Sequence, residues 1–127
     1  MKYIDGFVLV VPRENIEAYT EMARDGGELW KRHGALEYKE CIGDDMTPDV
    51  PGYQGMRFPA MAGAREDETV VFSYIAFESR EHRDAVNAKV MEEMSKNPDK
   101  YKDKPMPFDM KRMAYGGFKT IVDPFEK

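Results

Sequence analysis

The sequence predicts a single α+β domain, residues 1–127, whose elements follow the order β-α-β-β-α-β. Residues 3–11 and 69–77 are rich in β-branched and aromatic side chains, which favour strands. Residues 13–34 repeat apolar side chains at three- and four-residue steps, the period of one buried helix face. A chain of 127 residues is long enough for one ordinary domain and too short for two.

The first half of the chain predicts a strand, a helix and a second strand. Pro12 ends the first strand, because proline cannot donate to a sheet ladder. Gly26 and Gly27 lie inside the predicted helix, where each glycine costs about 1 kcal/mol relative to alanine. We therefore expect the helix to pack unusually close to the sheet at this point. The second strand is predicted over residues 35–42, with Cys41 as a small core residue.

The second half begins with a long loop, residues 43–67, which is rich in proline and glycine. We expect only a short turn near residues 58–62 inside it. Loops of this length are often lids, binding loops or partner-covering arms. After the third strand, Ser79 is the expected N-cap of a second helix that ends at Asn97. The last strand is predicted over residues 111–122.

The two clearest strands are apolar on both faces, which predicts that both faces of the sheet are buried. On the first strand Phe7 and Leu9 point one way, whereas Val8 and Val10 point the other. Right-handed crossovers place both helices on the same face, so the four-stranded antiparallel sheet lacks a cover on its other face. Burying about 800 Å² is worth roughly 20 kcal/mol for each partner before the costs of association. We predict a homodimer formed face to face; the alternative cover is the loop 43–67.

Four segments resemble the bacterial family called domain of unknown function 1428. They are YIDGFVLVVP, HGALEYKECIGDD, EDETVVFSYIAFESREHRDAVNAKVM and MPFDMKRMAYGGF. The resemblance implies a ferredoxin-like protomer with two helices on one face, and two sheets paired into a dimeric α/β barrel with the helices outside. It implies no activity, since relatives in that superfamily include cofactor-independent monooxygenases, haem-degrading enzymes, isomerases and ligand-sensing domains.

Composition argues against several classes of function. One cysteine rules out an internal disulfide and a multi-cysteine metal site. The formal net charge is -5, and acidic residues dilute the basic stretch after residue 95, so we expect no nucleic-acid partner. A mean hydropathy of -0.67 and a polar N-terminus predict a cytoplasmic protein without a membrane partner. The sequence contains no standard catalytic motif and only two histidines, and we expect no cofactor or metal.

The candidate ligand pocket consists of polar side chains on strands that otherwise bury theirs. An ionised carboxylate is costly to bury alone, so Arg112 is the expected counter-charge if Asp5 or Glu40 faces inward, unless the pKa of the carboxyl rises. Tyrosines would add aromatic walls and hydroxyl donors. Gly6, Gly116 and Gly117 indicate a bulge or leave room for a ligand. The candidate residues are Asp5, Tyr38, Glu40, Ser73, Tyr74, Arg112 and Tyr115.

These features favour a homodimeric barrel that binds a small organic ligand. One alternative is a cofactor-independent monooxygenase or isomerase acting on a small aromatic substrate. In that enzyme Tyr38 or Tyr115 would orient the substrate, and Asp5 or Glu40 would move a proton. The other alternative is a stress-related interaction module without catalysis, in which the loop 43–67 contacts a partner.

Overall fold

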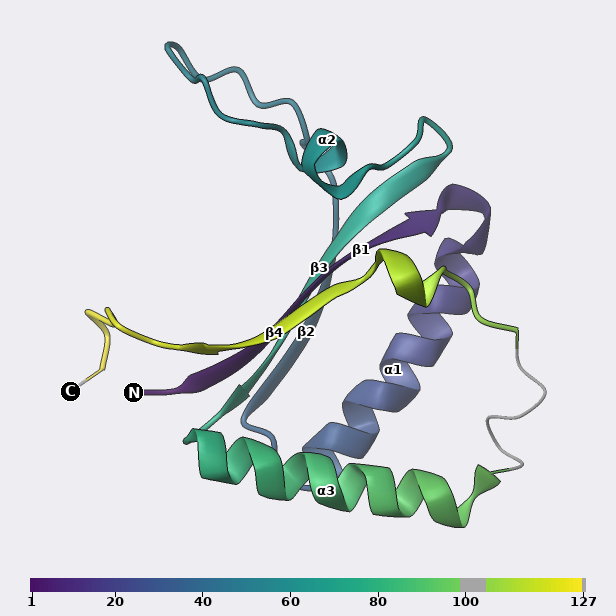
Figure 1. Cartoon of the computed structure of the whole chain (residues 1–127), viewed down its shortest axis with the longest axis vertical. Helices are drawn as coiled ribbons and strands as arrows, with labels where there is room; N and C mark the ends of the chain where they lie inside the picture. Colours follow the sequence, from purple (N-terminus) through teal and green to yellow (C-terminus); the bar gives the residue numbers. More distant parts are fainter. Residues whose placement is uncertain (99–104, 127) are drawn as a thin grey trace.

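The computed structural model describes residues 1–98 and 105–126 and has the α+β, ferredoxin-like order of elements (Figure 1). The prediction of fold class is therefore confirmed. The elements are β1 (Tyr3–Pro12), the 3-10 turn η1 (Arg13–Asn15), α1 (Ile16–Arg32), β2 (Glu37–Ile42), α2 (Phe58–Ala62), β3 (Glu68–Phe77), α3 (Arg80–Lys96), the 3-10 turn η2 (Met110–Arg112) and β4 (Ala114–Lys119).

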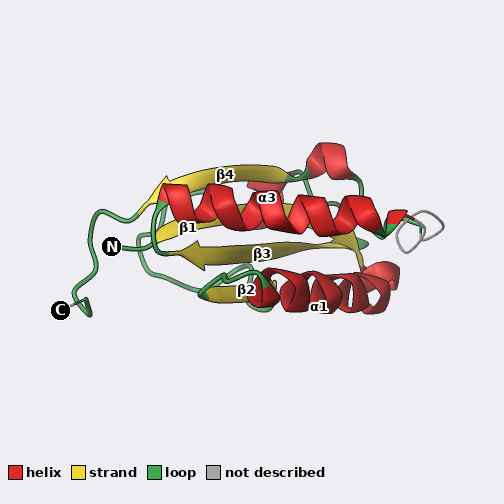
Figure 2. Ribbon diagram, turned by 90° about the horizontal axis from the view of Figure 1, so that it is seen from below, coloured by secondary structure: helices red, strands yellow, loops and turns green. Residues whose placement is uncertain are grey.

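The four strands form one antiparallel sheet in the order β2-β3-β1-β4. β1 and β3 pair over ten residues, from Tyr3 opposite Phe77 to Pro12 opposite Glu68. The long helices α1 and α3 both lie on one face of this sheet (Figure 2). The main core lies between them and the sheet, and it includes Leu9, Val71, Ile75, Val86 and Val90.

Helix α1 approaches the sheet closely at its two glycines, as the sequence predicts. A Cβ atom on Gly27 would lie 3.0 Å from Cδ1 of Tyr38, and one on Gly26 would lie 3.2 Å from the Tyr38 hydroxyl. The missing side chains therefore make room for the Tyr38 ring, which lies between β2 and α1. The helix tolerates the low helix propensity of glycine because an aromatic ring fills the space.

The face without the long helices is only partly covered. The short helix α2 contacts β1 and β3, and nearby Val10 and Val70 are buried. The rest of the loop that carries α2 rises beyond the end of the sheet (Figure 1). Phe72 and Phe118 remain 48% and 61% exposed on this face. The loop therefore covers one end of the face and leaves its centre open.

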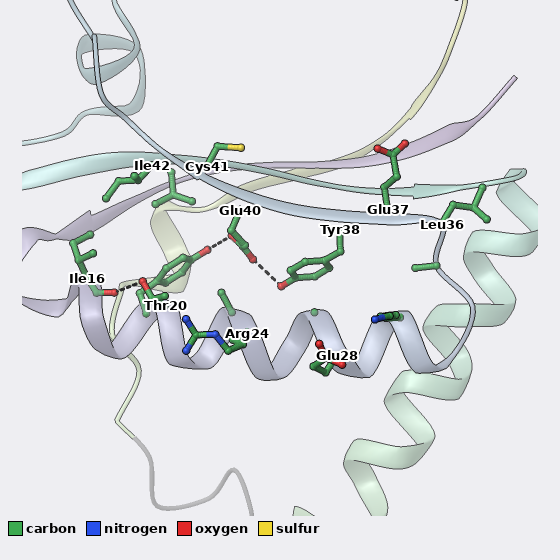
Figure 3. A pocket seen from close by; sticks show the side chains of 16 residues that line it. Ile16, Thr20, Arg24, Glu28, Leu36, Glu37, Tyr38, Glu40, Cys41 and Ile42 are labelled. Carbon is green, nitrogen blue, oxygen red and sulfur yellow. Dashed lines mark hydrogen bonds between the residues drawn. The ribbon is translucent and has the colours of Figure 1, made fainter. Parts of the chain in front are cut away.

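Three local predictions are wrong. Cys41 is exposed rather than buried, because β2 is an edge strand and Cys41 points away from the helices (Figure 3). The segment before β4 is the 3-10 turn η2, so the last strand starts at Ala114 instead of residue 111. The space beside Gly6 is filled by the Phe118 ring, 3.0 Å from a built Cβ atom, and that beside Gly117 by Tyr3. Neither of these glycines leaves room for a ligand.

Candidate functional site

A cleft of about 560 Å³ lies between α1 and the edge strand β2 (Figure 3). We call it the edge cleft, and its lining includes Thr20, Ala23, Arg24, Tyr38, Glu40 and Ile42. Residues alternate along β2, so Tyr38 and Glu40 point toward α1 while Glu37 and Cys41 point away. The strand thus delivers one carboxylate and one phenol into a largely apolar cleft.

Glu40 is the polar centre of this cleft. The hydroxyl of Tyr19 donates to Oε1 of Glu40 at 2.7 Å, and the hydroxyl of Tyr38 donates to Oε2 at 2.7 Å. No lysine, arginine or histidine within residues 1–98 and 105–126 forms an ion pair with Glu40. Two neutral donors therefore hold the carboxylate in place, and its remaining lone pairs can accept from a ligand.

Both phenols stay protonated well above neutral pH. Burial, together with the adjacent Glu40 carboxylate, raises the pKa of Tyr19 and of Tyr38 above the ordinary tyrosine value. Each hydroxyl consequently remains a hydrogen-bond donor rather than becoming a phenolate. The three side chains form a fixed, acceptor-rich group, which we call the Glu40 trio.

A second, inner cavity of about 150 Å³ lies between the helices and the sheet. Tyr19, Tyr38 and Glu40 line both hollows, so the Glu40 trio stands between them. The rest of the inner lining includes Phe7, Leu9, Trp30, Ser73, Ile75 and Phe108. Ser73 faces Glu40 across β2 and β3 as its register partner. Four of the predicted pocket residues line this cavity, namely Tyr38, Glu40, Ser73 and Tyr74.

Asp5 and Tyr115 belong to a different cluster near the start of α3. Asp5 is only 1% exposed, and Nη1 of Arg83 donates to its Oδ1 at 2.7 Å. The same nitrogen donates to the Tyr115 hydroxyl at 3.1 Å, and Nδ2 of Asn87 donates to the other Asp5 oxygen at 3.4 Å. Asn87 in turn accepts from the indole of Trp30 at 2.9 Å. This cluster is a satisfied buried ion pair rather than a vacant pocket.

Arg112 does not serve as the counter-charge of Asp5 or Glu40, so that prediction is wrong. Its Nη1 donates to Glu68 at 2.6 Å, and its Nη2 donates to the other Glu68 oxygen at 2.9 Å and to the carbonyl of Gly63 at 2.7 Å. The bidentate geometry is the one that arginine and carboxylates favour. Arg112 therefore fastens the α2 segment to the far end of the sheet.

Tyr74 lies on the sheet face away from the long helices. Its hydroxyl accepts from Nζ of Lys39 at 3.2 Å and donates to Glu37 at 3.3 Å. The residue is one position from Ser73 on β3, and adjacent strand residues point to opposite faces. Tyr74 consequently does not project toward the Glu40 trio.

The sequence reasoning missed Tyr19 and Arg83. Tyr19 lies at an apolar position of the α1 repeat, and its hydroxyl is what reaches the edge strand. Arg83 occurs in a charged stretch of α3, where nothing in the sequence distinguishes it from its neighbours. In residues 1–98 and 105–126 no three metal-ligating side chains form a cluster, and no helix there is long and apolar enough to span a bilayer.

The sheet, its helices and the cleft define a ferredoxin-like α+β protein with a carboxylate-centred hollow at the sheet edge. Residues 2–110 match the family described as Protein of unknown function (DUF1428), and the chain belongs to that family. Uncharacterized protein YbaA of Escherichia coli strain K12 is 45% identical over 123 residues, covering 97% of this chain and 99% of YbaA. YbaA of Shigella flexneri matches to the same extent. Among solved structures, the De novo designed protein Foldit4 aligns with a TM-score of 0.43 and 12% identity, over 95% of this chain and 100% of its own.

Proposed function

We propose that this protein is a homodimer that binds a small organic ligand at the Glu40 trio. The ligand site is supported by one observation: among the described residues, the Glu40 carboxylate at the wall of an apolar cleft is held by two tyrosine hydroxyls alone. Ligand pockets are typically apolar with a few convergent polar groups. The edge cleft, at about 560 Å³, lies within the usual range of such pockets.

The dimer is supported by the open centre of the sheet face without long helices. Phe72 and Phe118 are exposed there, next to other apolar side chains of β1 and β3. Exposed apolar patches of this kind favour association in water. A second copy, packed sheet to sheet, would bury them and leave α1 and the edge cleft on the outside.

A neutral solvatochromic dye, Nile red, tests the ligand site. We expect its fluorescence to rise on mixing with the protein, and we expect Thr20→Trp to abolish the rise because Thr20 lines the edge cleft. Glu21→Trp is the matched control, since Glu21 is the next residue on α1, is exposed and does not line either hollow. Equal dye binding by the two variants would exclude the edge cleft as the site.

Sedimentation velocity at micromolar concentration tests the dimer. The natural protein is expected to sediment as a dimer, and Phe72→Glu as a monomer, because a charge would then lie in the apolar interface. Met91→Glu is the control, because Met91 is 55% exposed on α3, on the other side of the sheet. A natural protein that sediments as a monomer would exclude the face-to-face homodimer.

The same geometry favours a second candidate, a cofactor-independent isomerase. Glu40 has no paired cation among the described residues and borders two hollows, so it can take a proton from a carbon acid and return it to a neighbouring position. We expect such an enzyme to exchange the α-hydrogens of cyclohexanone, a simple ketone probe, with D₂O. Glu40→Gln should stop the exchange while Nile red still binds; unchanged exchange would exclude the proton-transfer role.

A cytoplasmic location is part of the proposal. The chain has a single cysteine, Cys41, and so no internal disulfide, as suits a reducing compartment. Fractionation of cells that express the protein would test this, and recovery from the periplasm would contradict it.

A further inference from the structure

We propose that the inner cavity binds a single-ring phenol, with the phenol hydroxyl held between Glu40 and Ser73. This inference rests on the proposed ligand site because it uses the same Glu40 trio from the side of the inner cavity, and it names a chemical class of ligand for that side. It is carried by a serine hydroxyl on the cavity wall, by an acceptor opposite that hydroxyl, and by the size and lining of the cavity.

Ser73 is 5% exposed and lies on the cavity wall. Its hydroxyl forms no hydrogen bond with any group of residues 1–98 and 105–126. In that part of the chain, every side-chain nitrogen or oxygen that is shut off from solvent has a partner. The Ser73 oxygen therefore reaches the free volume of the cavity. A hydroxyl that faces a cavity can both donate to and accept from a bound molecule, so the Ser73 hydroxyl is available for a ligand.

Glu40 lies opposite Ser73 and supplies the complementary function. The two residues are register partners on β2 and β3, which places their Cβ atoms about 5 Å apart. An ionised carboxylate can only accept, whereas a serine hydroxyl can also donate. A ligand hydroxyl satisfies both groups at once, because it donates to Glu40 and accepts from Ser73. A ligand carboxylate would instead be repelled by Glu40.

The remaining lining favours an aromatic ring attached to that hydroxyl. The cavity measures about 150 Å³, and an engineered apolar cavity of about this size takes up benzene. Its wall contains an edge-to-face pair, Tyr19 and Phe108, with ring centroids 5.7 Å apart, and a tilted pair, Trp30 and Tyr38, at 6.3 Å. Rings at such positions contact a further ring favourably along their faces and edges. The volume therefore matches one benzene-sized ring.

Calorimetric titration of the full chain with phenol, toluene and benzoate tests the proposal. We expect the dissociation constant of phenol to be at least fivefold lower than that of toluene. The phenol hydroxyl adds hydrogen bonds, and a single hydrogen bond accounts for about a factor of five. Benzoate is expected not to bind. Ser73→Ala should weaken phenol about fivefold and leave toluene unchanged, because the variant keeps the cavity and removes only the hydroxyl.

Two further variants separate this effect from general damage to the fold. Ser73→Leu fills the cavity and should abolish binding of both phenol and toluene. Ser95→Ala is the matched control, since Ser95 is exposed on α3 and bonds only the backbone of its own helix, and it should bind phenol like the natural protein. If Ser73→Leu does not fold, the contrast between phenol and toluene in Ser73→Ala still decides the question.

The results distinguish this inference from the proposed function on which it rests. Phenol that binds no better than toluene, or that is unaffected by Ser73→Ala, would overturn the inference. If the natural protein binds Nile red in the edge cleft but takes up no phenol, the inference falls and the proposed ligand site stands. If neither molecule binds, both fall.

Discussion

Replacing Arg83 with methionine should destabilise the protein more than any exposed charge substitution. Arg83 is the sole ion-pair partner of Asp5 within residues 1–98 and 105–126, at 2.7 Å, and its side chain is 13% exposed. It also donates to the Tyr115 hydroxyl, and its guanidinium lies 5.0 Å from the ring centre of Tyr3. Methionine keeps most of the apolar length of the side chain and removes the charge and the donors.

The expected loss of stability follows from the contacts that Asp5 keeps in Arg83→Met. The neutral Asn87 contact at 3.4 Å and the nearby Tyr115 hydroxyl remain, so a carboxylate that is 1% exposed is left without its charged partner. Breaking such a buried pair costs about 3–5 kcal/mol, and the slight exposure of Arg83 favours the lower end. With a urea m-value of about 2 kcal/mol/M, the unfolding midpoint should fall by about 1.5 M. Chemical unfolding at one fixed protein concentration measures the shift, because a dimer makes stability depend on concentration.

Two comparisons make this result interpretable. Lys96→Met removes a pair with Glu92 in which both side chains are mostly exposed, and it should change the midpoint little. The double variant Asp5→Leu/Arg83→Met replaces both charges with apolar groups and should recover most of the lost stability. The reasoning is refuted if Arg83→Met shifts the midpoint no more than Lys96→Met does.

Three shorter predictions concern other contacts. Arg112 lowers the pKa of Glu68 from 4.5 to about 2. Their ion pair therefore stabilises the fold fully above about pH 4.5 and progressively less as the pH falls toward 2. In Arg112→Met, the free energy of unfolding measured with urea should depend less on pH across this range. Gly27→Ala should not give the stability gain of about 1 kcal/mol usual in a helix, because its Cβ would meet Tyr38 at 3.0 Å, and a melting temperature raised by several degrees would contradict this. Burial and the Glu40 carboxylate raise the pKa of Tyr38, so Tyr38→Phe should leave the tyrosinate absorbance developed by about pH 11 unchanged.

The sequence was sufficient to predict most of the fold, because each element has a local signal. Runs of β-branched and aromatic residues mark β1 and β3, and a 3.6-residue repeat marks α1. Ser79 does cap α3, since it accepts from the backbone of His82 at 3.0 Å. The errors occur where tertiary context decides. Cys41 resembles a core residue locally, and only the order of the strands shows that β2 is an edge.

The sequence was sufficient to predict the strand residues of the candidate site but not the partners of its charged groups. Tyr38 and Glu40 share a face because they are two positions apart, and Ser73 joins them through the pairing of β2 with β3. The partners of the charged groups depend on contacts between distant segments. Arg83 lies 78 positions from Asp5, and no local pattern favours it over Arg112 as the counter-charge.

One feature of β3 links the ligand site to the proposed dimer surface. Phe72 and Tyr74 point to the face without long helices, while Ser73 between them points to the inner cavity. A slip of one residue would exchange these faces, placing a hydroxyl in the open apolar patch and an aromatic ring where the phenol is proposed to bind. Ten residue pairs with β1 and six with β2 hold β3 in its register. The same backbone pairing therefore determines both the Ser73 hydroxyl on the cavity wall and the exposed Phe72 ring on the opposite face, although the two proposals can be tested independently.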